Sequence, residues 1–490
     1  MNNKIALCWV LVMISMTLQS AAINNEVKAQ GGTGFKINDI RTFESNDDTV
    51  FKEDGQTITG TRAQGGTGYK IRYKASEVNP NVTSGILDEV ELVNIYMGPV
   101  VSTSPVKVFN IEALTTNDTY LVGFDSIPQI SLGDEVKVSG FFDAASRSVI
   151  TRIEKVAPLS EWKLSGYATA ISNNQFKINE QVINYLPNQL SGCGVALDEG
   201  ELVEVQTIAQ NAFDINSQLD QVISINCIDE MIANTESTVI IEGMIDAFNG
   251  DDELLLSGQA VNLLNNTRYI RGRFTDLQVN IKVEIEGALA ENGSTLLAEK
   301  VRFIEPRFNL VIPVMPENVI NNQVNVAGVS MLIPPQFTDP EGLFDGGLDE
   351  TTQLKLSGYD QSGQLYLTQV NAVGNVNFDE VSANGLVTLV QQPELAIFGV
   401  SIDTTNAVFF DQQGEMIGVD DFFARVTVGA EIEIELASLD VQTGLIQGGE
   451  ITLIEQPEKA STAKNGNEST VVGIGTLTSL PDAVFQNSFE

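Results

Sequence analysis

Carboxylates and cysteines are the only side chains of this sequence whose type and spacing suggest chemistry. The 490 residues include no histidine, which removes the Ser-His-Asp and Cys-His mechanisms, imidazole metal ligation and the commonest general base near neutral pH. Catalysis would have to rest on paired carboxylates, as in glycoside hydrolysis. Clefts that cleave sugars are lined with aromatic residues, and Trp162 is the only tryptophan beyond the first 22 residues. We therefore expect no catalytic residue, no cofactor-binding residue and no enzymatic activity.

Two acidic segments have the composition of a calcium site. One is the loop Asp339-Pro-Glu341-Gly-Leu-Phe-Asp345-Gly-Gly-Leu-Asp349-Glu350, which places several carboxylates on a glycine-containing backbone, as a hard cation needs. The other contains Asp246, Asn249, Asp251 and Asp252. Neither has the EF-hand spacing, so solvated turns are the favoured interpretation. Metal ligands stay unknown, and calcium is the one cofactor that the sequence leaves open.

The cysteines indicate a disulfide rather than a metal site. Cys8 lies inside an N-terminal apolar run, so Cys193 and Cys227 are the two that remain after it. Two cysteines without histidine do not make a structural zinc site. An oxidising exterior would join them, and the alternative is a pair of buried free thiols. We predict the Cys193–Cys227 disulfide.

The N-terminus has the features of an export signal. Lys4 supplies the positive start, and Ile5 to Leu18 form an apolar run too short to span a bilayer. Small residues favour cleavage after Ala22, with a second possible site after Ala29. No later stretch of about 20 apolar residues follows. We expect no transmembrane segment in the mature chain and a periplasmic or extracellular location.

The charge of the chain argues against two classes of partner. It has 65 acidic and 27 basic residues, for a formal charge of -38, and no cluster of Lys and Arg reverses that field locally. Nucleic acid and anionic membrane surfaces are therefore disfavoured. The two Gly-Gly-Thr-Gly segments, ending at Gly34 and Gly68, lack the Lys-Ser/Thr ending of a phosphate loop and are interpreted as turns.

A strand pattern that returns about every 75 residues organises the chain. Its copies alternate apolar and polar residues, which is the period of a half-buried strand. An opening strand with an internal glycine precedes each copy, as at Gly85, Gly166, Gly243 and Gly385, except the fourth, which starts near Asn309 to Ile312. The copies are Gly133-Asp-Glu-Val136-Lys-Val138-Ser-Gly140, Gly200-Glu-Leu-Val203-Glu-Val205-Gln-Thr207, Val283-Glu-Ile285-Glu-Gly287, Leu354-Lys-Leu356-Ser-Gly358 and Gly429-Ala-Glu-Ile432-Glu-Ile434-Glu-Leu436.

Five strands in each unit of about 70 residues, without a helical period, favour a small closed barrel. An immunoglobulin-like sandwich would need about seven strands and nearer 100 residues. We expect an all-β protein, a tandem array of about five small barrels. The predicted segments are a signal peptide at 1–22, a Gly-Thr-Gly-rich segment at 23–80, barrel repeats at 81–158, 159–232, 236–306, 308–376 and 380–455, and a linker with a C-terminal tail at 456–490.

The opening glycine strand, the signature strand and the closing Ala-x-x-Val strand together resemble the bacterial domain-of-unknown-function family 5666. The third repeat, from Glu242 to Val301, carries the resemblance most completely, with Gly243, Val283, Ile285, Gly287, Ala298 and Val301 in the expected places. The resemblance implies OB-like barrels in an envelope or secreted protein and names no activity. The tail from Asp482 to Glu490 is similar to C-terminal sorting tails of exported proteins, and an unstructured end is the alternative.

These observations predict a non-enzymatic exported protein that acts as a binding or spacer module at the cell envelope, with an unknown envelope or extracellular ligand. The alternative is a calcium-dependent or carbohydrate-binding adhesive protein. OB-type barrels bind oligonucleotides or oligosaccharides on one face. Tyr167, Phe176 and Tyr359 lie on the relevant strands, and we interpret them as barrel filling rather than stacking platforms.

Overall fold

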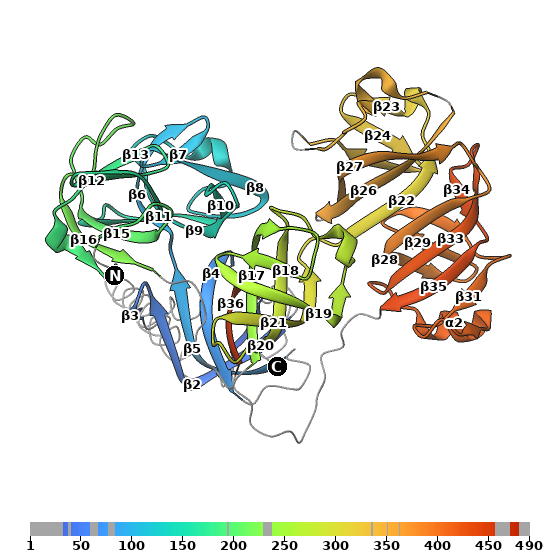
Figure 1. Ribbon diagram of the computed structural model, residues 1–490, viewed down its shortest axis with the longest axis horizontal. Helices are drawn as coiled ribbons and strands as arrows, with labels where there is room; N and C mark the ends of the chain where they lie inside the picture. The colour runs from blue at the N-terminus through green and yellow to red at the C-terminus, as the bar shows by residue number, and fades with distance from the viewer. Residues whose placement is uncertain are drawn as a thin grey trace, which may run out of the picture. The chain divides into compact units, whose positions relative to one another are not determined.

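The computed structural model describes residues 33–37, 41–58, 67–76, 84–193, 196–228, 238–334, 337–349, 351–361, 363–455 and 471–479. Most residues of these ranges lie in strands (Figure 1), and α2 (Val419–Arg425) is their one α-helix. No helix in them has the length and apolar composition needed to cross a membrane. The chain divides into two compact units, Met1–Leu263 with Ile285–Ala298 and Ala460–Glu490, and Leu264–Glu284 with Glu299–Lys459. The predicted signal peptide and the tail from Asp482 lie outside the described residues.

One ring of five strands recurs along the chain, and we name its members, in repeat order, the opening, second, third, signature and closing strands. In barrel 1 the strands pair around the ring in the order opening, second, third, closing and signature. The signature strand also pairs with the opening strand and so closes the ring. Pairing is antiparallel except between the third and closing strands. These strands are β6 (Tyr96–Thr103), β7 (Val106–Val108), β8 (Ile111–Val122), β9 (Glu135–Phe142) and β10 (Ser148–Lys155).

Four more barrels follow with the same strand roles, and they confirm the predicted array of small OB-like barrels. Barrel 2 contains β11 (Glu161–Ser172), β12 (Gln175–Ile178), β13 (Gln181–Asn184), β14 (Leu190–Ser191), β15 (Leu202–Ile208) and β16 (Val222–Cys227). Barrel 3 contains β17 (Thr238–Phe248), β18 (Glu253–Leu256), β19 (Gln259–Ile270), β20 (Lys282–Leu289) and β21 (Thr295–Phe303).

Barrels 4 and 5 complete the series. Barrel 4 contains β22 (Arg307–Pro313), β23 (Val319–Ile320), β24 (Gln323–Val326), β25 (Val329–Leu332), β26 (Thr352–Gln361) and β27 (Gln364–Asn375). Barrel 5 contains β28 (Val381–Gln391), β29 (Glu394–Ile397), β30 (Val400–Asp403), β33 (Glu431–Asp440), β34 (Leu445–Gln447) and β35 (Glu450–Glu455), with β31 (Val408–Phe410), β32 (Met416–Ile417) and α2 inserted after the third strand.

The repeated apolar pairs of the signature strands fill the barrel interiors. Their alternation places every second side chain inside the ring, and each of these residues has an exposed fraction of 0%. They are Val136 and Val138, Val203 and Val205, Val283 and Ile285, Leu354 and Leu356, and Ile432 and Ile434.

The two flanks of the chain form a sixth barrel, so the prediction that they lie outside the repeats is wrong. We call it the terminal barrel: its strands are β1 (Thr33–Ile37), β2 (Arg41–Glu53), β4 (Tyr69–Ser76), β5 (Ser84–Val93) and β36 (Val471–Ser479), with β3 (Gln56–Thr57) attached to β2. Strand β36 pairs antiparallel with β4 and β1, and β2 pairs parallel with β5. The ring therefore has the pairing of barrel 1 with β36 as its opening strand.

A hydrogen bond outside the strand ladders also identifies β36 as the opening strand of the terminal barrel, because the same bond recurs in other barrels. In the terminal barrel the Gly68 N–H donates to the Leu477 carbonyl at 2.8 Å. The N–H of Gly200 donates in the same way to Ala168 in barrel 2, and that of Gly429 to Val387 in barrel 5, each at 2.8 Å. The opening strand of this barrel is thus supplied from the far end of the chain, and the other four strands come from the N-terminal flank.

This arrangement also corrects the opening strand predicted for the first repeat. Gly85 lies in β5, which pairs with β4 and β2 as the closing strand of the terminal barrel. The opening strand of barrel 1 is β6, whose Gly98 is the register partner of Val136. Gly166 and Gly385 face the first signature residue in the same way, opposite Val203 and Ile432.

Glycine occupies this position because another side chain packs directly over it. A Cβ on Gly98 would collide with the Phe109 ring, and one on Gly385 would collide with the Phe398 ring. Both phenylalanines sit in the turn between the second and third strands, at φ 55° and 47°. Barrel 4 carries Ile312 opposite Leu354 instead, and its matching turn residue is the small Ala327, at φ 48°.

The glycine at the last position of the signature pattern is required for a different steric reason. A Cβ on Gly140, Gly287 or Gly358 would collide with a backbone carbonyl of the neighbouring closing strand. Barrel 2 has Thr207 at this place, and its hydroxyl donates a 2.8 Å hydrogen bond to the Gln221 carbonyl.

The barrels associate in pairs through their opening strands. Strand β6 of barrel 1 pairs antiparallel with β11 of barrel 2, and β22 of barrel 4 with β28 of barrel 5. In the terminal barrel β36 pairs with β17 of barrel 3, in the parallel sense. Backbone hydrogen bonds therefore join the barrels of each pair, beyond the covalent connection.

Candidate functional site

A groove of about 460 Å³ lies between barrels 4 and 5, within the second unit. One side is formed by residues 325–330 of the β24–β25 hairpin, together with Pro313, Met315 and Asn318. The other side is formed by Leu439 and residues 441–444 of the turn after β33. Phe378, in the segment that connects the two barrels, completes the lining. The volume falls in the range of small-molecule sites.

Two glycine-containing turns allow the walls to approach each other. Gly328 and Gly444 both have positive φ, at 77° and 72°, which glycine adopts without strain. A Cβ on Gly444 would lie 3.1 Å from the Gly328 nitrogen. A larger residue at position 444 would therefore push the two turns apart.

The groove lining is neutral, although the chain as a whole carries a formal charge of -38. None of its residues is ionisable. Its hydrogen-bonding groups are the amides of Asn318, Asn325 and Gln442 and the hydroxyls of Ser330 and Thr443. Half-buried Phe378 adds an aromatic face. This set suits an uncharged ligand with many hydroxyl groups, because a buried charge would find no partner here.

In the acidic loop predicted as a possible calcium site, three carboxylates accept backbone hydrogen bonds. Asp339 accepts from the N–H groups of Leu343 and Phe344 at 2.9 and 2.7 Å. Asp349 accepts from the Thr351 N–H at 2.8 Å, and Glu341 from the Ala372 N–H at 3.1 Å. The side chains of Asp345 and Glu350 lie outside the described part. In the other acidic segment, Asp246 accepts from the Gly258 N–H at 2.8 Å and Asn249 from the Asp251 N–H at 3.0 Å.

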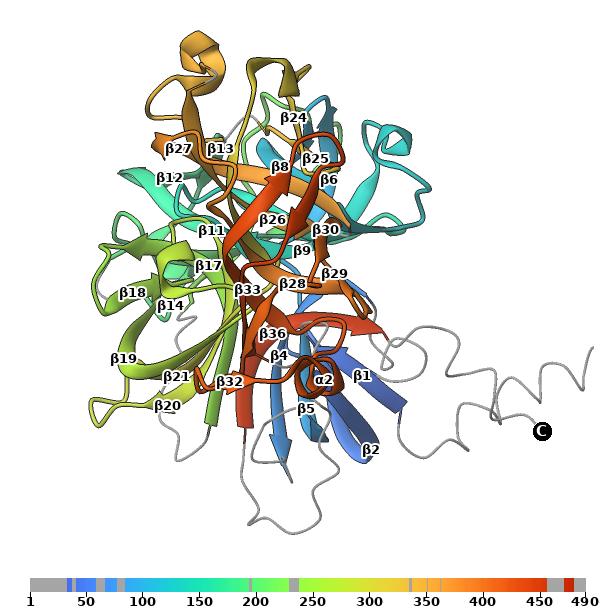
Figure 2. The same ribbon diagram turned by 90° about the vertical axis from the view of Figure 1, so that its right-hand side faces the viewer.

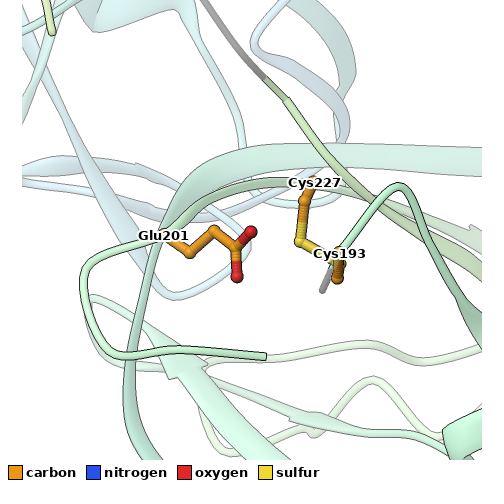
Figure 3. A group of neighbouring side chains, drawn as sticks. All are labelled: Cys193, Glu201 and Cys227. Atoms are coloured by element: carbon orange, nitrogen blue, oxygen red, sulfur yellow. A yellow bond between two sulfur atoms is a disulfide. The ribbon is translucent and has the colours of Figure 1, made fainter. Parts of the chain in front are cut away.

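Cys193 and Cys227 are joined as a disulfide in barrel 2, with their Cα atoms 4.9 Å apart (Figure 3). The parallel pairing of β14 with β16 brings the two segments together, since Ser191 is the register partner of Asn226. A carboxylate oxygen of Glu201 and the two sulfurs lie within 4.8 Å of one another, the one such cluster of possible metal ligands in the described ranges. Because the sulfurs are bonded to each other, they are not thiolate ligands, and the cluster is structural.

One carboxyl group in the second unit has a strongly altered pKa. Burial raises the pKa of Glu431 from its ordinary value of 4.5 to about 7, while a hydrogen bond from Asn384 and the nearby charge of Arg273 oppose the rise. The Asn384 amide donates to one Glu431 oxygen at 3.3 Å, and the other oxygen is buried without a hydrogen-bond partner. Such a group is a candidate proton donor, but glycoside hydrolysis needs a second carboxyl across a cleft, and Glu431 does not line the groove.

The polar residues between the signature apolar positions vary in charge sign, and most of them form ion pairs. Lys137 binds Glu53 at 2.7 Å, and Glu204 binds Lys163 at 2.5 Å. Glu433 binds Arg273 at 2.8 Å, and the buried Glu284 binds Arg302. These contacts occupy the charged groups in structural roles, so the signature strands do not present a shared ligand site.

The three aromatic residues singled out from sequence have ring partners. Phe176 is fully buried and packs edge-on against Tyr185, with ring centroids 5.5 Å apart. Tyr167 packs against Phe142 at 5.5 Å, and Tyr359 stacks on Tyr366 at 5.3 Å. Phe176 is barrel filling, as predicted, and the two half-buried tyrosines are held by aromatic neighbours.

The ring order and the repeated glycine positions define a class: tandem small OB-like β-barrels. Residues 242–302, which cover nearly all of barrel 3, match the family model described as Domain of unknown function (DUF5666). The chain therefore carries a domain of this family, and the resemblance stated from the third repeat is confirmed. No curated protein matches the chain. The groove was not predicted, because its two walls come from turns more than 100 residues apart; the glycines at 328 and 444 were the only local signal.

Proposed function

We propose that this chain is a non-enzymatic exported protein whose barrels act as a binding and spacer module at the cell envelope. The observation that supports it is the backbone pairing between opening strands, which couples neighbouring barrels into larger rigid pieces. A spacer needs such coupling, because barrels joined only by single connecting segments would reorient independently. The repeated scaffold leaves the turns and insertions free to vary, and these carry the ligand contacts.

Fractionation of cells that express the tagged full chain tests export. We expect processing after Ala22, seen as the new N-terminus in mass spectrometry, and recovery from the periplasmic or external fraction. A Leu11→Arg variant should remain unprocessed in the cytoplasm, because the charge interrupts the apolar run, while Leu11→Ile should behave as the natural chain. Unprocessed natural chain in the cytoplasm would contradict the proposal.

A second candidate function, carbohydrate-binding adhesion, is supported by the neutral groove of barrels 4 and 5. Its ligand would be an uncharged oligosaccharide, bound by the groove amides and hydroxyls with Phe378 against a sugar face. The net negative charge of the chain does not oppose an uncharged ligand. Binding here would give the spacer an attachment point.

A matched pair of glutamines tests the groove. Gln442 and Gln413 are both exposed, and each has its N–H bonded to an aspartate two residues earlier, at 2.9 and 3.0 Å. Only Gln442 lines the groove. We expect Gln442→Arg, but not Gln413→Arg, to abolish retention of neutral oligosaccharides on a glycan array. Equal binding by both variants, or no binding by the natural chain, would sink this candidate.

A further inference from the structure

Strand β36 completes a barrel whose other strands lie at the opposite end of the sequence. Strand β5 ends at Val93 and β36 begins at Val471. Figure 2 shows β36 beside the N-terminal strand β4. In barrels 1, 2, 3 and 5 the opening strand is directly followed in sequence by its own second strand, and in barrel 4 only the two-residue strand β23 intervenes. In the terminal barrel, by contrast, the opening strand β36 is not continuous in sequence with the other four strands.

The site that receives β36 has hydrogen-bonding partners on both edges. Along one edge, β4 pairs with it from Leu477↔Tyr69 to Val471↔Ala75. Along the other edge, β17 pairs with its first half and β1 with its last residues. Each of the two Gly-Gly-Thr-Gly segments is followed by an aromatic residue, a lysine and an isoleucine. The first copy supplies Ile37 and the second supplies Tyr69, and these are the register partners of Leu477 on its two sides.

Side chains make the site selective for this strand. Val471 and Leu477 are buried in the barrel core, at 0% and 1% exposure. A Cβ on Gly473 would collide with the Tyr73 ring. The buried Glu242 carboxylate accepts two 2.7 Å hydrogen bonds from Thr476, one from its N–H and one from its hydroxyl. A strand must therefore combine a glycine, a hydroxyl and two apolar residues at fixed places.

We propose that the terminal barrel contains a strand-acceptor site, formed by β1, β2, β4 and β5 together with β17 of barrel 3. This site binds one β36 strand, either that of its own chain or that of a second copy of this chain. The second copy is the partner that the structure specifies, because its own β36 has the same sequence and therefore meets every one of these requirements. The contacts in an exchanged assembly are those of the closed single chain, so exchange costs no hydrogen bond and no buried area. Concentration then sets the balance between closure within one chain and exchange between chains.

Cross-linking between two single-cysteine variants tests the exchange. Lys74 and Val472 are register partners across β4 and β36. One copy carries Lys74→Cys and the other Val472→Cys. The two are unfolded together with the natural disulfide intact, refolded at high concentration and treated with a short bis-maleimide. We expect a covalent heterodimer, at least about tenfold above background and increasing with refolding concentration, with the 74–472 link identified by mass spectrometry.

Three controls fix the meaning of the result. The double variant Lys74→Cys/Val472→Cys should cross-link within one chain, which shows that the barrel closes and the reagent reaches it. Val441→Cys, 62% exposed in barrel 5, replaces Val472→Cys to measure random collision. Adding Gly473→Val to the Val472→Cys copy should remove the heterodimer, because its strand no longer fits. If the double variant closes but the mixed pair gives no more dimer than the Val441→Cys control, the acceptor site does not exchange strands and the proposal fails.

Discussion

At the residue scale, Glu431 is a carboxyl group whose pKa departs strongly from that of an ordinary acidic side chain. It is 2% exposed, its hydrogen bond to Asn384 satisfies one oxygen, and burial raises its pKa to about 7. The charged groups that act on it are Arg273, which lowers the pKa, and Asp276, which raises it. The raised pKa means that folding favours the protonated carboxyl.

Glu431→Gln should therefore alter how stability depends on pH. A carboxyl whose folded pKa exceeds its unfolded value loses stability as pH rises between the two, here from about 4.5 to about 7. The loss across this window corresponds to about 3 kcal/mol. We expect urea unfolding of the natural chain to show this decline and Glu431→Gln to lack it. Glu394→Gln, at an exposed glutamate, should keep the decline; if Glu431→Gln also keeps it, the assignment is wrong.

The opening glycines give a second prediction at this scale. Gly98→Ala should destabilise barrel 1 by about 1–3 kcal/mol, because the added methyl meets the fully buried Phe109 ring. Trimming the ring with Phe109→Leu should reduce that penalty in a double-mutant cycle followed by thermal unfolding. Gly418→Ala is the control, since its Cβ would have only Asp421 nearby, at 3.8 Å. Additive effects of the first two substitutions would contradict direct contact.

At the scale of elements, the disulfide holds the two-residue strand β14 against β16 in barrel 2. The bond spans 34 positions, and closing a loop of this size stabilises a fold by about 3–4 kcal/mol in the chain-entropy account. The inserted segment between β15 and β16 lies inside this loop and is also anchored by buried Leu219, which forms a bridge with Ile183, and by the ring of Phe213, which packs on Trp162.

Replacing both cysteines by serine should loosen barrel 2 locally. We expect faster amide hydrogen exchange in β14 and β16 and unchanged exchange in β26 and β27 of barrel 4, because local unfolding is confined to the element that loses its link. Non-reducing mass spectrometry of the natural chain should find no free thiol at either position. Uniform acceleration across all barrels, or two free thiols, would contradict a local structural role.

How far the sequence predicts these elements depends on the range of the interactions. Alternation and turn residues are local, so the barrels, the signature strands and the start of barrel 4 near Asn309 were all recognisable. The terminal barrel was missed because its ring is closed by pairing between β36 and β4, which no local pattern records. A signal was present: Gly68-Tyr-Lys-Ile71-Arg-Tyr73 has the glycine-to-apolar spacing of Gly133-Asp-Glu-Val136-Lys-Val138. The groove depends on pairing between barrels 4 and 5 and had no comparable signal.

At the scale of the whole molecule, charge and barrel pairing act in opposite directions. The formal charge of -38 generates self-repulsion that weakens the compact state. Pairing through opening strands, together with partly buried ion pairs such as Lys137–Glu53, holds neighbouring barrels together. Salt screens the exposed charges much more than the buried pairs.

The melting midpoint of the full chain should therefore rise with ionic strength. Calcium chloride and magnesium chloride at equal ionic strength should raise it equally, because the carboxylates of Asp339, Glu341 and Asp349 already accept hydrogen bonds. Differential scanning fluorimetry with and without a chelator measures both effects. An increase specific to calcium and reversed by chelator would instead indicate a binding site and would favour the calcium-dependent adhesive function.

The place of β36 in the terminal barrel also has a consequence for the timing of folding. Among the strands that the structure describes, translation makes β1, β2, β4 and β5 first and β36 last, so the terminal barrel is begun before the other five and completed after them. Until Val471 to Ser479 emerge, the edges of β4 and β1 stay unpaired, a state that promotes aggregation and recognition by chaperones. A translation product that stops early keeps those edges unpaired unless the β36 of another copy fills them. Closure of the terminal barrel thus reports that the ribosome has passed Ser479.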